Sequence, residues 1–159
     1  MTARAFHVAA LVLAAACTSP AHGARGDGGP LVGVWTAQFE LTEPLPFSTR
    51  SRLAVEGTVA MTANRSSHVQ IDGLGIATHV GTYDVDFRTL GFDPEQNGSP
   101  TISAVTRGDS AVLEMGDANQ TLVVMRGSVR RDSITGTWRV FEPRAGGAGR
   151  FLMTRRGQR

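Results

Sequence analysis

Apolar and polar residues alternate along most of this chain after residue 30, and this pattern determines the fold class that we expect. In the first such stretch, residues 31–42, Trp35 and Phe39 fall on one face, whereas Gln38 and Glu40 fall on the other. A period of two is typical of a strand with one buried face. No segment after the first seventeen residues keeps a helical period over ten residues. The sequence therefore predicts an all-β fold.

Further stretches of the chain show the same strand pattern. They cover residues 52–62, 67–72, 79–87, 99–107, 111–115, 120–131, 133–141 and 150–155. Turn signals such as Gly108-Asp109 and Arg131-Asp132 separate several of them at the spacing of hairpins. We therefore expect about eight or nine short antiparallel strands.

An antiparallel meander of this size has to protect the edges of its sheet, and closure into a barrel removes them. Several glycines inside the strand patterns indicate the tight bends or bulges that a small barrel needs. They are Gly57, Gly81, Gly127 and Gly136. The sequence favours a small antiparallel meander β-barrel of about eight strands, and the alternative is a β-sandwich of two packed sheets.

The first seventeen residues have the layout of a secretory signal. Arg4 precedes an apolar run that ends at Ala16 and is too short for a permanent membrane helix. The small residues Ala15 and Ala16 precede Cys17, the only cysteine of the chain. This arrangement resembles the lipobox of bacterial lipoproteins, which implies that a lipid-modified Cys17 becomes the first residue of the mature protein. A single cysteine has no intrachain disulfide to make, which favours acylation; the alternative is ordinary cleavage after Gly23.

These features predict three segments: a helical signal peptide at 1–16, a lipid-anchored flexible tether at 17–29, and a barrel domain at 30–159. The tether is rich in Gly, Pro and Ser and has too little apolar surface to order itself. Its reach is on the order of 20 Å. The expected location is the bacterial cell envelope, membrane-anchored and facing the periplasm or the cell surface, with secretion as the alternative.

The charge balance argues against nucleic acid as a partner. The chain has 16 basic and 14 acidic residues, and every basic residue is an arginine. Nucleic-acid binding calls for a strong basic excess or for interleaved aromatic and basic residues, and the sequence has neither.

The two ends of the predicted barrel resemble lipocalins and the wider calycin group. Gly33-Val34-Trp35 opens the first strand, and Arg155 lies on the inward face of the last strand, as Phe151 and Met153 do. Those families place a Gly-x-Trp on the first strand and pack a C-terminal arginine across the tryptophan. The resemblance therefore implies that Gly33, Trp35 and Arg155 form a structural closure at one end of the barrel.

No arrangement of residues for catalysis is apparent in the sequence. The sole cysteine lies in the signal region, no serine sits in Gly-x-Ser-x-Gly, and His68 and His79 are not spaced as metal ligands on one strand. The segment 93–98 resembles the start of a calcium loop, but Ala104 stands where a bidentate glutamate is needed. We expect neither an enzyme, nor a cofactor, nor a metal site.

Two functions of a non-enzymatic barrel remain open. In the first, the interior binds a small apolar or amphipathic ligand, and the candidate ligand-binding residues are His79, Tyr83, Met125 and Trp138. In the second, the barrel is filled by its own side chains and acts as a structural or protein-interaction module of the envelope. The number of large inward side chains distinguishes these two functions, because enough of them would fill the interior and leave no room for a ligand.

Overall fold

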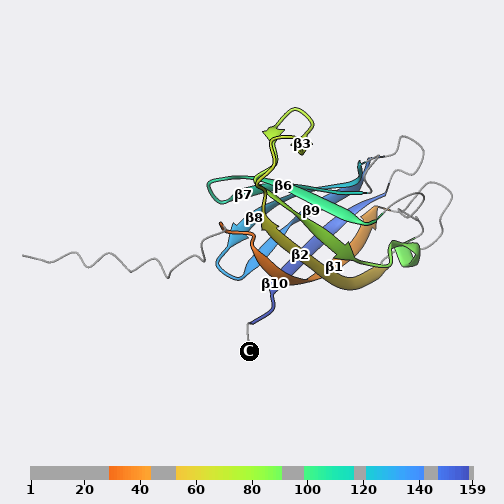
Figure 1. Ribbon diagram of the computed structural model, residues 1–159. Coiled ribbons are helices and arrows are strands. Elements are labelled where there is room, and N and C mark those ends of the chain that lie inside the picture. The colour runs from red at the N-terminus through yellow and green to blue at the C-terminus, as the bar shows by residue number, and fades with distance from the viewer. Residues whose placement is uncertain (1–28, 44–52, 91–98, 117–120, 142–146, 158–159) are drawn as a thin grey trace, which may run out of the picture.

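The computed structural model describes residues 29–43, 53–90, 99–116, 121–141 and 147–157. Within these ranges eight strands close into one antiparallel barrel (Figure 1), so the predicted fold class is confirmed and the sandwich alternative is wrong. The barrel strands are β1 (Gly33–Glu43), β2 (Ala54–Ala63), β5 (His79–Asp84), β6 (Thr101–Arg107), β7 (Ser110–Gly116), β8 (Thr121–Arg130), β9 (Ser133–Val140) and β10 (Ala148–Arg155). The expected signal helix, almost all of the tether and the segment 93–98 lie outside the described residues.

The barrel closes because β1 pairs with the last strand as well as with β2. The order around the barrel is β1-β10-β9-β8-β7-β6-β5-β2. The β1–β10 register runs from Trp35 opposite Arg155 to Leu41 opposite Gly149. All barrel pairs are antiparallel, and β5 is the strand that follows β2 in the barrel.

Residues 67–72, which were expected to form a barrel strand, do not join the barrel. They contribute only β3 (Gln70–Ile71), which pairs with β4 (Gly75–Ile76) in a separate hairpin, seen projecting from the barrel in Figure 1. Ile71 of β3 and Ala77, which directly follows β4, pack on Val105 of β6, which faces outward and is nevertheless buried. The segment therefore covers part of the outer surface of the barrel, because its apolar side chains pack against β6 from outside.

The stretch 79–87 also ends earlier as a strand than expected. β5 stops at Asp84, and residues Phe87–Leu90 form the 3-10 turn η1. Phe87 and Leu90 are buried and belong to the same core cluster as the inward side chains of the strands. The turn therefore adds apolar side chains to the end of the barrel interior where β5 finishes.

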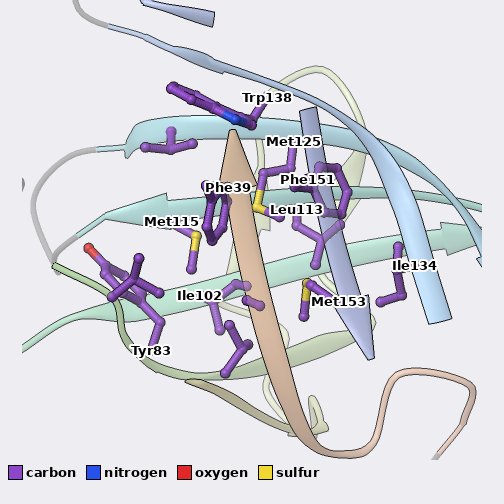
Figure 2. Close-up of a cluster of buried hydrophobic side chains, with 14 of the residues drawn as sticks. Phe39, Tyr83, Ile102, Leu113, Met115, Met125, Ile134, Trp138, Phe151 and Met153 are labelled. Carbon is purple, nitrogen blue, oxygen red and sulfur yellow. The ribbon is translucent and has the colours of Figure 1, made fainter. Parts of the chain in front are cut away.

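The barrel interior is one continuous hydrophobic core. Figure 2 shows Phe39, Leu113, Met115, Met125 and Phe151 pointing into the same space from β1, β7, β8 and β10. Each of these side chains occupies a buried position in the alternation of its strand. The inward phases that the sequence predicts therefore hold.

The glycines inside the strands mark close approach between strands. The register irregularities lie at Leu41/Glu43 and Met115/Gly116, so none of the expected bulges occurs at Gly57, Gly81, Gly127 or Gly136. Gly127 and Gly136 are direct partners on β8 and β9. A Cβ on Gly127 would lie 2.8 Å from Cζ of Phe151, whose ring crosses this pair from β10. The two missing side chains therefore make room for one aromatic ring.

Gly136→Ala should lower the stability of the barrel by about 2–3 kcal/mol, the cost typical of overpacking. A Cβ there would overlap the Arg126 carbonyl and lie 2.5 Å from Cα of Gly127, and backbone atoms cannot rotate away. The measurement is the urea midpoint of unfolding. Gly157→Ala is the matched control, because a Cβ at Gly157 would meet nothing within 4 Å. Equal midpoints for the two variants would contradict this account of the β8–β9 contact.

Candidate functional site

One end of the barrel is sealed by the side chain of Arg155. Its guanidinium lies 4.3 Å from the centre of the Trp35 ring and donates hydrogen bonds to the carbonyls of Val32 and, at 2.7 Å, Pro30. The indole N–H of Trp35 donates to the Leu31 carbonyl at 2.9 Å. A cation over an indole contributes about 0.5–2 kcal/mol. These contacts fasten residues 30–32 across the end of the barrel.

Gly33 is required by the same arrangement. Its φ is +134°, which disfavours residues with a Cβ, and a Cβ would lie 2.9 Å from one terminal nitrogen of Arg155. The structure thus brings together the residues from which the calycin resemblance implied a closure: Gly33, Trp35 and Arg155. Asp132, in the turn between β8 and β9, adds a carboxylate 3.8 Å from Nε of Arg155. In this geometry, Gly33, Trp35 and Arg155 hold the segment before β1 against the end of the barrel.

The two ends of the barrel differ in their connections. The turns at Gly108-Asp109 and Arg131-Asp132 lie at the end sealed by Arg155, as does the segment that carries β3 and β4. At the opposite end β1, β5, β7 and β9 finish and β2, β6, β8 and β10 begin, and the four internal gaps in the described chain fall between these strand ends. We call this second end the loop end.

Tyr83 and Trp138, two of the predicted ligand-binding residues, belong to one aromatic cluster inside the barrel. Tyr83 lies edge-to-face with Phe87 at a centroid distance of 6.0 Å, and Phe87 lies 5.1 Å from Phe39. Phe39 in turn lies 6.2 Å from Trp138. Met125 is directly opposite Trp138 across β8 and β9. Three of the four predicted residues therefore face a shared space.

His79 lies apart from this cluster. It is four residues from Tyr83 on β5, a separation of about 13 Å along a strand. Nδ1 of His79 lies 2.8 Å from the Thr78 hydroxyl. A Cβ on Gly29 would lie 2.8 Å from Nε2 of His79, so the imidazole sits against the segment that precedes β1. His79 therefore belongs to the sealed end.

The four predicted residues have almost no accessible surface. The exposed fraction is 0% for Met125, 1% for Trp138, 3% for His79 and 6% for Tyr83. A side chain that lines a void large enough for a water molecule keeps some accessible surface, even where the void is closed. Neighbouring side chains therefore occupy the space that a ligand beside Met125 or Trp138 would need.

Trp138 is also fixed by hydrogen bonds. Its indole N–H lies 3.0 Å from the Arg150 carbonyl and 3.2 Å from the Glu40 carbonyl, so it donates to two neighbouring strands. A Cβ on Gly149 would lie 2.8 Å from this nitrogen, which shows how closely the indole crosses β10. These two hydrogen bonds hold the indole against the backbone of β10 and β1.

Sequence reasoning missed two contributors to the interior. Leu90 is buried but lies beyond the alternating stretch, and the only signal for it is its spacing of three residues from Phe87, as in a helical turn. Gly149 precedes the predicted last strand, and no local pattern indicates that an indole crosses it. Leu90 is buried by the local turn η1, whereas the role of Gly149 depends on its contact with Trp138 of β9.

Titratable groups in the described ranges form no constellation of the kind that holds a metal ion, since no group of three or more His, Cys, Asp or Glu side chains gathers there. Asp84 and Asp86 are exposed, and a hydrogen bond from the Arg88 side chain at 2.8 Å lowers the pKa of Asp86.

The described residues contain no helix long and apolar enough to cross a membrane.

Arg155→Ala should destabilise the protein by about 1–3 kcal/mol, because it removes the contact with Trp35 and the hydrogen bonds to residues 30 and 32. Arg156→Ala is the matched control: its guanidinium makes a single, exposed hydrogen bond among the described residues, to the Thr36 hydroxyl, and we expect a loss below about 0.5 kcal/mol. Chemical unfolding measures both. Equal midpoints would show that the contacts of Arg155 contribute nothing to the fold.

No protein-family model, curated protein or solved structure matches this chain. The resemblance to the calycin group stays an expectation, based on the residues at the sealed end.

Proposed function

We propose that this protein is an exported envelope protein, anchored by a lipid on Cys17, whose barrel is a filled scaffold that acts through its outer surface and loops. The observation that carries this proposal is the burial of the barrel interior, where Trp35, Phe39, Leu113, Met125 and Met153 have no exposed surface. An eight-stranded barrel is narrow enough for its own side chains to fill. A filled interior leaves the outside as the place of interaction.

The energetics of the core support the scaffold. A ligand pocket has a volume of about 300 Å³ or more, and a cavity of that size beside Met125 would require several large side chains to leave the core. Each buried aliphatic or aromatic side chain contributes about 1.5–3 kcal/mol through the hydrophobic effect. Their displacement would therefore cost more than a small apolar ligand commonly returns.

Binding of a small apolar or amphipathic ligand is the second candidate, and one observation favours it. Among the buried apolar residues, Tyr83, Val85 and Val140 are less completely buried than those at the centre, and all three lie toward the loop end. A ligand would therefore enter at the loop end and meet Tyr83 first. The same proposed envelope location applies to both candidates.

The scaffold proposal predicts that the purified protein does not bind N-phenyl-1-naphthylamine, an apolar probe that fluoresces in dry pockets. The physical reason is that the interior has no space for the probe beside Met125 and Trp138. A fluorescence titration of the wild-type protein is the measurement. Tyr83→Ala is the comparison at the loop end, and Val34→Ala is the control on the outer face, where Val34 is exposed. Saturable binding by the wild type that Tyr83→Ala weakens and Val34→Ala leaves unchanged would favour the second candidate.

Lipid anchoring predicts that Cys17→Ser abolishes acylation and either releases the protein or stalls signal cleavage. The thiol is the atom to which the lipid attaches, and serine lacks it. Intact-mass analysis and membrane fractionation are the measurements. Thr18→Ala, one residue further on, is the matched control and should leave the protein with the membranes. An unmodified Cys17 or a mature start at Ala24 would contradict the anchor.

A further inference from the structure

Charge is segregated around the circumference of this nearly neutral protein. Strands β8, β9 and β10 are neighbours in the barrel and contain five arginines but no aspartate or glutamate. Strands β5, β2 and β1 are likewise neighbours, and they contain four carboxylates but no arginine or lysine. The barrel therefore has one basic and one acidic face.

The basic face consists of the outward arginines of β8, β9 and β10, which are all exposed: Arg126, Arg130, Arg139 and Arg150. The acidic face consists of the exposed carboxylates Glu40, Glu43, Glu56 and Asp84. At the boundary between the two faces, Glu40 lies opposite Arg150 across β1 and β10. Within the described part of the chain, the ion pairs of arginine involve Arg88, Arg131 and Arg155, and none of the basic face.

Three of these arginines surround one small polar residue. Arg126 and Arg150 are the direct partners of Thr137 on its two sides, so their Cα atoms are about 10 Å apart. Arg139 follows Thr137 by two residues on the same face, at about 7 Å. Because an arginine side chain reaches about as far as these separations, the three guanidinium groups can converge above Thr137. Such a fork of N–H donors suits phosphate oxygens.

We infer that the basic face docks on anionic phospholipid headgroups, an inference that rests on the proposed lipid anchor. The anchor supplies the proximity: a flexible tether as long as residues 18–29 has an expected reach on the order of 20 Å, so a lipid on Cys17 would hold the barrel within contact distance of the surface. The described chain begins at Gly29 at the sealed end, where Arg130 also lies. The anionic surface attracts the basic face and repels the acidic face, so the charge pattern fixes which side of the barrel meets the membrane.

Two faces of opposite charge on one chain also allow a second copy to bind head to tail, with the acidic face of one barrel on the basic face of the next. The membrane is the better partner because the tether holds every copy beside it, whereas pairing between copies depends on protein concentration. This difference separates the two outcomes in an experiment.

The test uses the full chain, processed and acylated by the cell, on vesicles of phosphatidylcholine with or without phosphatidylglycerol. Thr137→Cys places a single free thiol on the basic face, and Thr82→Cys places one on the outward side of β5, beside the acidic face. A fluorophore on the thiol is quenched by spin-labelled headgroups when it touches the surface. We expect quenching at position 137 only, on anionic vesicles only, with reversal in high salt because salt screens exposed charges.

The triple variant Arg126→Gln, Arg139→Gln and Arg150→Gln should lower the ratio of docked to undocked protein by about 100-fold, since each basic residue near an anionic surface contributes about fivefold. The control variant Arg65→Gln, Arg88→Gln and Arg107→Gln loses the same charge elsewhere and should dock like the wild type. Equal quenching at both positions, or on neutral vesicles, would overturn the inference.

Two further measurements keep the outcomes apart. Sedimentation in detergent reports self-association, and dimers that both the triple variant and Glu56→Gln weaken would replace the membrane with a second copy as the partner. Intact mass reports the anchor: if Cys17 proves unmodified, co-sedimentation of that protein with anionic vesicles tests the basic face alone. Failure of the anchor and failure of the basic face are therefore distinguishable.

Discussion

The pairing of the first strand with the last is the interaction on which the structure depends. Without the β1–β10 pair, the sheet would have two long edges with unpaired backbone groups, and the inward faces would remain open to water. These strands are more than 100 residues apart in sequence, so their pairing has to offset a large loss of chain entropy. Arg155 strengthens the pair because it binds Trp35 and residues 30–32 at the same time.

Closure also determines what the interior can do. Once the barrel is closed, the Phe151 ring covers the glycine pair of β8 and β9, and the Trp138 indole crosses β10 to reach the Glu40 carbonyl. Each large side chain thus occupies space that another strand leaves free. This packing leaves the outer surface, with its segregated charges, as the place of the proposed function.

Much of the fold follows from the alternation of residues. The alternation predicts β1, β2 and β5 to β10 to within a few residues, together with the side chains that face inward, because a strand's side-chain direction is a local property. It fails for residues 67–72, whose apolar residues pack on Val105 outside the barrel. It also misses Leu90, because η1 is a turn with a different period.

The candidate site, too, is only partly predictable from the sequence. The inward phase of Trp35 and Arg155, and of Tyr83, Met125 and Trp138, is readable from the sequence, because it needs only the count along each strand. The filling of the interior and the separation of His79 from the aromatic cluster depend on which strands are neighbours. The same holds for the basic face, whose arginines come from three strands. The sequence by itself therefore determined the strands and their inward faces, whereas the neighbours of each face were decided by the tertiary structure, because closure joins segments that no local pattern relates.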